Sequence, residues 1–204
     1  MKKLPKILII TIVIVCGILI FKKSQHLTKK DIEFNPYKVG DSLFFQSTKN
    51  EKDTIIITSI YKQKLTEKCY SLLTCIPTYL FGETWEGYYV NSEFPNNHGE
   101  AWDDILTIRA EKDGTKTIMF SLYKKDACWY GNNDMENNAN KILNLPTIKF
   151  ERGQKIFNDV IIIPSTNKEY RDRDDFIAKM YWSKSQGLVG FDKLNGDKWT
   201  IVKK

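Results

Sequence analysis

The stretch of sequence that decides the fold is LTIRAEKDGTKTIMFSL, residues 106–122. Apolar side chains recur at every second position in both of its halves: Leu106, Ile108, Ala110, Ile118, Phe120 and Leu122. Between the halves lies Asp113-Gly114, a pair favoured where a tight turn requires positive φ. Because a period of two places alternate side chains on one face of a strand, the stretch predicts an antiparallel hairpin with one buried and one solvated face.

Strand-like runs continue on both sides of this hairpin. Apolar, β-branched or aromatic runs occupy residues 41–47, 54–61, 156–163, 176–182, 187–191 and 199–202. The polar loop 48–53 joins the first two runs, and a loop with Asn195-Gly196 joins the last two, so each pair is expected to form a hairpin. One short helix is expected at Glu67–Leu73 or at Asp134–Leu145. The chain is therefore expected to be mainly β, with an antiparallel sheet arranged as a meander, an open half-barrel or a sandwich.

An uncharged stretch of 15 residues, Ile7–Phe21, precedes this β region. As a helix it would extend about 22 Å, short of the roughly 30 Å hydrocarbon core of a bilayer. Lysines flank it on both sides, and their long stems can reach the interface and extend the usable span: Lys2, Lys3, Lys6, Lys22 and Lys23. No small residues at alternate positions follow Phe21, as a signal peptidase site would require. The stretch therefore predicts an uncleaved transmembrane signal-anchor, with a cleaved signal peptide as an alternative.

Cys16 raises a second alternative, a lipoprotein in which this cysteine carries the lipid. A lipidated cysteine needs a small residue before it and polar residues after it. Val15 is β-branched, and residues 17–21 remain apolar. We therefore interpret Cys16 as a small side chain within the membrane helix.

The distribution of charge separates the expected anchor from the rest of the chain. The chain has a formal net charge of +6, but residues 1–26 contain five lysines and no acid, which leaves 26 basic and 25 acidic residues in the rest. A nearly neutral domain is not expected to bind nucleic acid. We expect residues 1–23 to form the membrane anchor, 24–34 a linker, and 35–204 one β-rich domain. A short amino terminus before a single span favours export of the carboxyl-terminal domain to the periplasmic side.

Three cysteines lie outside the anchor: Cys69, Cys75 and Cys128. An exported domain meets an oxidising compartment, so one disulfide is expected, and its pairing stays open. Three buried free thiols are the alternative. Their spacing matches no zinc pattern.

The strongest catalytic candidate surrounds His98. Glu100, Asp103 and Asp104 follow it closely and would suit a metal site or a general base, and Cys128 with His98 would suit a nucleophile and its base. One histidine near several acids is, however, a common loop composition. We therefore assign no catalytic, cofactor-binding or metal-binding residue from the sequence.

Three other segments carry suggestive residues. Residues 131–138 offer oxygen ligands without the spacing of a calcium loop, and are interpreted as a surface turn. Residues 170–175 have mixed charges that suit a solvated loop. The aromatic segment Thr84–Val90 would suit either a ligand groove or packing on a sheet.

The carboxyl-terminal third contains a recognisable series of motifs: Phe157-Asn158-Asp159-Val160, Lys179-Met180-Tyr181-Trp182-Ser183-Lys184, Gly187-Leu188-Val189-Gly190-Phe191, Asn195-Gly196 and Trp199. Together with Tyr37-Lys38-Val39-Gly40-Asp41, this series resembles small uncharacterised envelope proteins and lipoproteins of Bacteroidetes-type bacteria. The resemblance implies an anchored β-rich envelope domain and carries no catalytic residues.

These observations lead to three functional hypotheses. The first is a non-enzymatic binding or interaction domain, held in the membrane by residues 7–21, with an envelope protein or lipid as its partner. The second is a carrier or sensor that holds a lipid or another apolar ligand on a half-barrel sheet. The third, less expected, is a hydrolase or metal enzyme built around His98. The sequence gives no motif for an organic cofactor, and we expect none.

Overall fold

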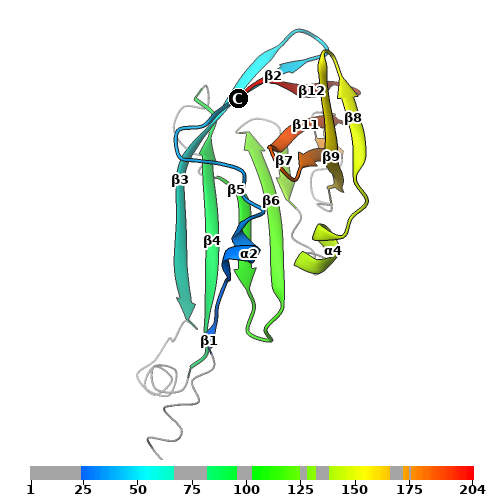
Figure 1. Cartoon of the computed structure of the whole chain (residues 1–204). Helices are drawn as coiled ribbons and strands as arrows, with labels where there is room; N and C mark the ends of the chain where they lie inside the picture. The colour runs from blue at the N-terminus through cyan, green and yellow to red at the C-terminus, as the bar shows by residue number, and fades with distance from the viewer. Residues whose placement is uncertain are drawn as a thin grey trace, which may run out of the picture.

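The computed structural model describes residues 24–66, 82–95, 103–124, 128–131, 138–165, 172–174 and 176–204. Within them the chain is mainly β, and eleven strands form one large, open antiparallel sheet to which the short β1 adds a parallel pair with β4 (Figure 1). The elements are β1 (Ser24–Gln25), α2 (Lys29–Ile32), β2 (Ser42–Ser47), β3 (Lys52–Thr66), β4 (Thr84–Glu93), β5 (Asp103–Ala110), β6 (Lys116–Lys124), β7 (Cys128–Gly131), α4 (Ala139–Leu143), β8 (Ile148–Arg152), β9 (Lys155–Pro164), β10 (Ile177–Ser183), β11 (Gly187–Lys193) and β12 (Lys198–Lys203).

Two meanders make up the sheet. Strands β2 to β7 lie side by side in chain order, and so do β8 to β12. The meanders join where β12 pairs with β2, in the register Ile201 opposite Phe45. The hairpins expected from the sequence are confirmed as β2–β3, β5–β6 and β11–β12, and the two further strands as β9 and β10. Gly114 and Gly196 have φ of +87° and +82°, as their turns require.

The sheet curls strongly, so that its two halves face each other across the core. Phe120 on β6 and Trp182 on β10 have ring centroids 4.7 Å apart. These strands are seven positions apart in the sheet order, which would separate them by roughly 34 Å in a flat sheet at about 4.8 Å per strand. Bulges bend strands and increase their twist. Register shifts of this kind interrupt the pairing at Ile57/Ser59, Val90/Asn91 and Ile201/Lys203.

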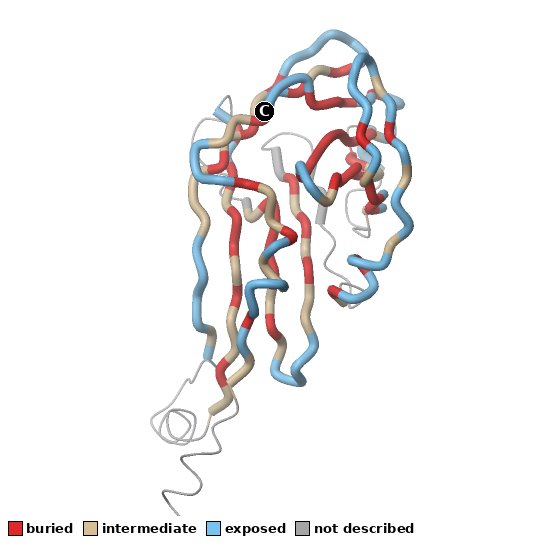
Figure 2. Tube along the Cα trace, in the orientation of Figure 1, coloured by how far each residue is buried: buried red, intermediate tan, exposed pale blue. Residues whose placement is uncertain are grey.

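The buried side chains follow the alternation seen in the sequence (Figure 2). The six apolar residues of the β5–β6 hairpin are all at most 2% exposed. They belong to a hydrophobic core that also includes residues of β2, β3 and β9 to β12. The one buried face predicted for this hairpin is therefore confirmed.

Residues 24–37 cross the core side of the sheet. They carry β1 and α2, and Leu27, Phe34 and Tyr37 are only 4–6% exposed. Phe34 stacks on Trp182 and meets Phe120 edge-on, so this segment lies between the two halves of the sheet. Residues 24–34, which were expected to form a linker, pack against the domain in the structure.

Glu86 on β4 fastens this segment to the sheet. Its carboxylate accepts hydrogen bonds from the Leu27 N–H at 2.7 Å and from His26 Nδ1 at 3.0 Å, and it pairs with Lys62 Nζ at 2.6 Å. Burial acts to raise the pKa of Glu86, but the hydrogen bonds from Lys62, His26 and the Leu27 N–H outweigh it and lower the pKa to about 2. The carboxylate is thus fully ionised at neutral pH and holds the entry of the chain in place.

The sequence also predicts one short helix and a membrane anchor. Helix α4 falls within the expected range 134–145, while Glu67–Leu73 lies outside the described residues. The anchor at residues 7–21 also lies outside them. In the part of the chain that the structure describes, no helix has the length and apolar character needed to cross a membrane.

Candidate functional site

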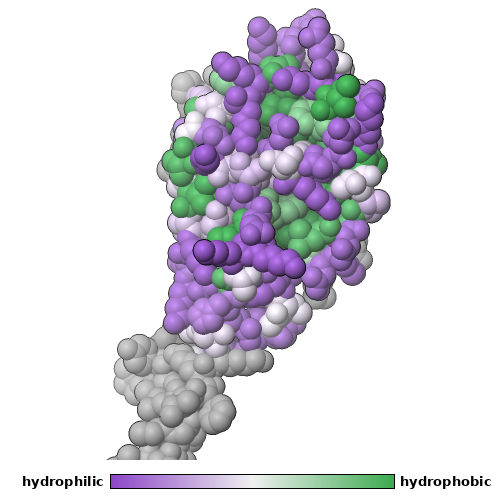
Figure 3. Space-filling model, in the orientation of Figure 1, coloured by the Kyte–Doolittle hydropathy of each residue, from purple (hydrophilic) through white to green (hydrophobic). Residues whose placement is uncertain are grey.

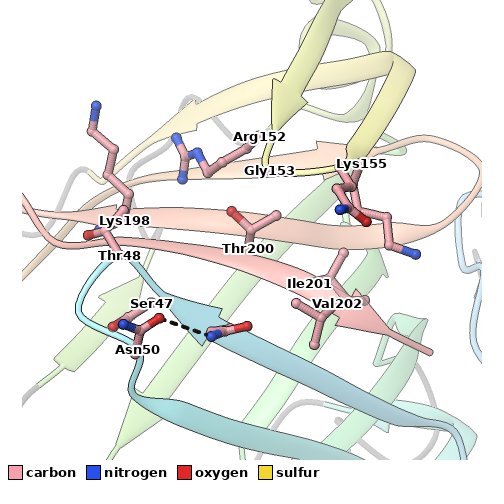
Figure 4. A pocket seen from close by; sticks show the side chains of 12 residues that line it. Ser47, Thr48, Asn50, Arg152, Gly153, Lys155, Lys198, Thr200, Ile201 and Val202 are labelled. Carbon is pink, nitrogen blue, oxygen red and sulfur yellow. Dashed lines mark hydrogen bonds between the residues drawn. The ribbon is translucent and has the colours of Figure 1, made fainter.

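A cleft lies between the turn of the β8–β9 hairpin and the outer face of β12 and β2 (Figure 4). Its volume is about 440 Å³, within the usual size range of small-molecule sites. It is lined by Gln46, Ser47, Thr48, Asn50, Arg152, Gly153, Gln154, Lys155, Lys198, Thr200, Ile201 and Val202. Three segments far apart in the sequence thus meet at one site.

The β8–β9 hairpin ends the curled sheet, and the packing of Phe150 on β8 holds it over the neighbouring strands. Phe150 lies on the ring of Tyr181, with centroids 4.3 Å apart, and it also approaches Gly190. A Cβ built on Gly190 would lie 3.3 Å from the Phe150 ring and 2.6 Å from the carbonyl oxygen of Trp199. A glycine at this position of β11 therefore allows the Trp199 carbonyl of β12 and the Phe150 ring of β8 to approach the β11 backbone closely.

Arg152 is held in place at the roof of the cleft. Its guanidinium lies 4.8 Å from the centroid of Phe150 and 4.9 Å from that of Tyr181. Its Nη1 donates to the carbonyl of Trp199 at 3.2 Å and lies 2.8 Å from Asp192 Oδ1. The latter contact is an ion pair.

Tyr181 completes the support beneath Arg152. Its hydroxyl donates to Asp192 Oδ2 at 2.8 Å, and Lys179 Nζ lies 3.5 Å from the same oxygen. Burial, and then the hydrogen bond to Asp192, raise the pKa of the Tyr181 hydroxyl. The phenol therefore stays protonated and keeps donating to Asp192, which in turn orients Arg152.

Two lysines add positive charge to the lining. Lys155 and Lys198 are exposed, and no described residue forms an ion pair with either ammonium group. The acid in the turn before β12 is already engaged: Asp197 accepts from Trp199 Nε1 at 2.9 Å and from Thr48 Oγ1 at 3.0 Å. Among the described residues that line the cleft there is no Asp, Glu or His. These residues can therefore provide hydrogen bonds and positive charge to a ligand.

The residues singled out around His98 are only partly described. His98 and Glu100 lie outside the described residues, and Asp103 begins β5. Asp104 is partly buried, and burial raises the pKa of its carboxyl group despite a hydrogen bond with Thr107 and the charge of Arg109. Among the side chains that the structure describes, no three of His, Cys, Asp or Glu gather to hold a metal. The hypothesis of a site at His98 is therefore not tested by the described residues.

The three cysteines outside the expected anchor are also only partly described. Cys69 and Cys75 lie outside the described residues, and of Cys128 only the backbone, in β7, is described. Their pairing therefore stays open.

The three other suggestive segments have structural roles where they are described. Asn138, the last residue of the 131–138 segment, caps α4 with its side chain. Asp174 accepts the Asn195 N–H through its carbonyl at 2.8 Å. The aromatic segment Thr84–Val90 lies in β4: Tyr88 accepts a hydrogen bond from Asn35 on the core side, and Tyr89 stacks on Tyr61 at 5.1 Å on the opposite face.

No sequence pattern predicts the cleft. Residues 148–152 are too few to show a clear strand period, so the Arg152-Gly153-Gln154-Lys155 turn is not expected from the sequence. Gly153, with φ of +61°, was the one local signal that could have indicated this turn. The pairing of β12 with β2, which brings Lys198 next to Gln46 and Thr48, leaves no mark in local periodicity.

Comparison with protein families, curated proteins and solved structures gives no significant match for this chain.

Proposed function

We propose that this protein is a membrane-anchored protein of the bacterial envelope whose exported β domain binds another envelope component without catalysing a reaction. The proposal combines the uncharged stretch Ile7–Phe21 between lysines with the resemblance of the carboxyl-terminal third to envelope proteins. The observation that carries it is the cleft beneath the β8–β9 hairpin, which is the right size for a ligand or a partner's side chains.

The position of the cleft suits a domain that is tethered at residue 24. Figure 1 places β1 at one end of the domain and the turn between β8 and β9 at the other. Ser24 pairs with Thr84 at the first end, next to the end of β3 at Thr66. An anchor that precedes residue 24 would thus leave the cleft facing away from the bilayer, accessible to a partner.

The lining favours binding over catalysis. Ser47, Thr48 and Thr200 contribute hydroxyl groups, and no histidine or acid that would deprotonate them is found among the lining residues that the structure describes. The amides and cations of the lining are groups that bind and orient a ligand. The lining therefore supports a binding role, and the third hypothesis depends on His98 alone.

The carrier hypothesis has less support. Leu27, Phe34 and Tyr37 occupy the core side of the curled sheet, where a half-barrel carrier would hold its ligand. A cavity beside Phe94 and Trp199 has a volume of only about 20 Å³, far below that of a lipid chain. In the view of Figure 3, polar side chains divide the apolar surface into separate patches.

Photocrosslinking in the native envelope tests the proposal. The full chain would carry a photoreactive amino acid at Gln154, in the turn above the cleft, or at the exposed Lys64, near the end of β3, as a matched control. We expect a discrete crosslinked product from position 154 and none from position 64. A product from position 64 alone, or from neither position, would contradict a binding role for the cleft.

Cell fractionation with protease digestion tests the membrane part. We expect the full chain in the membrane fraction, and we expect its domain to be digested only after the outer envelope is opened. A chain recovered in the soluble fraction, or a domain that is digested only after the inner membrane is lysed, would contradict the anchored, exported arrangement.

A further inference from the structure

The charge of the cleft differs from that of the domain as a whole. Beyond residue 26 the chain has 26 basic and 25 acidic residues, so its charges nearly cancel. The described lining of the cleft nevertheless contains Arg152, Lys155 and Lys198 and no Asp or Glu. Opposite charges are usually interspersed on a protein surface, and a concave region with one sign of charge concentrates ligands of the other sign.

Arg152 is already organised to bind an anion. Its guanidinium is fixed by the rings of Phe150 and Tyr181 and by Asp192, so little side-chain entropy remains to be lost on binding. Among the described residues, its contacts engage Nη1 alone. The N–H groups of Nε and Nη2 remain for a ligand, and a guanidinium fork suits carboxylate and phosphate groups.

Asp192 offsets about one positive charge at Arg152, so the uncompensated charge of the cleft comes from the two lysines. Figure 4 shows Lys198 and Lys155 toward opposite ends of the cleft, with Arg152 and Thr200 between them. The floor follows β12 from Lys198 to Val202, a length of about 13 Å at roughly 3.3 Å per residue. Thr200 on this floor is buried. Positive charge is thus distributed along an elongated groove.

We infer that the cleft binds an elongated ligand with at least two anionic groups, carboxylate or phosphate, which Lys198 and Lys155 bind toward its two ends while Arg152 binds between them. This inference rests on the proposed function, because it names the class of ligand for the same cleft. A single small anion would satisfy only part of this arrangement, and a neutral ligand would leave the lysines without a partner.

Isothermal titration calorimetry on the full chain in a neutral detergent tests the inference. The probes are tripolyphosphate, trigalacturonate, inorganic phosphate and the neutral maltotriose, each at low salt. We expect tripolyphosphate, trigalacturonate or both to bind, and we expect inorganic phosphate and maltotriose to bind at least tenfold more weakly. The difference between tripolyphosphate and trigalacturonate distinguishes phosphate from carboxylate chemistry. Raising the salt should weaken the binding, because exposed charges are screened.

A double variant, Lys155→Gln with Lys198→Gln, locates the binding. Its matched control is Lys64→Gln with Lys141→Gln, which removes the same charge from two exposed lysines elsewhere. We expect the affinity for the polyanion to fall at least tenfold in the cleft variant and less than twofold in the control. Both variants should keep the melting temperature of the parent protein, since all four lysines are exposed.

The outcomes separate this inference from the proposed function. An equal loss in both double variants, or no binding of either polyanion at low salt, would overturn the anionic ligand. If crosslinking from position 154 still succeeded, the binding role would stand with a different ligand class. Equal affinity for inorganic phosphate and for tripolyphosphate would overturn the elongated ligand.

Discussion

Phe34→Ala is expected to destabilise the domain strongly, because Phe34 fills the space between the two halves of the curled sheet. Its side chain is 6% exposed and stacks on Trp182 with centroids 5.8 Å apart, while its edge meets Phe120 at 5.9 Å. Truncating a buried phenylalanine to alanine typically costs about 3–5 kcal/mol. For a domain of this size each kcal/mol lowers the melting temperature by roughly 2–4 °C, so the expected decrease is about 6–20 °C.

The assay is thermal and urea unfolding of the full chain in detergent, followed by circular dichroism and by tryptophan fluorescence. Val39→Ala is the control, because Val39 lies nearby in the sequence but is 61% exposed. We expect this control to change the free energy of unfolding by less than about 0.5 kcal/mol. If residues 24–34 served only as a linker, the two variants would unfold together. A Phe34→Ala melting temperature within 2 °C of the parent would refute the packing argument.

Three further predictions concern single groups. Tyr37→Phe should lower the free energy of unfolding by about 1–3 kcal/mol. The buried N–H of Leu188 donates to the Tyr37 hydroxyl at 2.7 Å, and the variant leaves it without this acceptor. A urea midpoint equal to that of the parent would contradict this. Glu86→Gln should lower the melting temperature at pH 7. Because the pKa of Glu86 is lowered to about 2, the difference in melting temperature between variant and parent should be full above about pH 4.5 and should shrink as the pH falls toward 2. A difference in melting temperature that grows on acidification would contradict this prediction. Gly190→Ala should destabilise the domain, since the new Cβ would lie 2.6 Å from the Trp199 carbonyl oxygen. It should also loosen the β8–β9 hairpin, because that oxygen accepts from Arg152 and the Cβ would lie 3.3 Å from the Phe150 ring. Limited proteolysis with no faster cleavage near residues 152–155 would count against this account.

The elements that the sequence predicted well are those with short-range signals. The β5–β6 hairpin combines strict alternation with Asp113-Gly114, and the β11–β12 hairpin has Asn195-Gly196. In both cases a few residues determine the turn, and the turn then determines the register of the flanking strands. The short strand β8 and the four-residue helix α2 were not predicted, because each contains too few residues for a period to be detected.

The packing of residues 24–37 against the core could not be predicted from the sequence either. Most residues of this segment are polar, and only Leu27, Phe34 and Tyr37 are buried. The capping box formed by Thr28 and Asp31 is a local helix signal, but the helix is only one turn long. What fixes the segment is Glu86, 60 residues away in the chain from His26, and a contact of this range has no sequence pattern.

The sequence by itself determined that this protein is a mainly β chain of antiparallel hairpins, because alternation and turn chemistry act between residues close in the chain. Only the tertiary structure decided how these hairpins assemble. The pairing of β12 with β2, the curl that brings Phe120 to Trp182, and the overhang of Phe150 on Gly190 each depend on side chains far apart in the chain. The cleft exists because these long-range contacts together bring residues 46–50, 152–155 and 198–202 to one place.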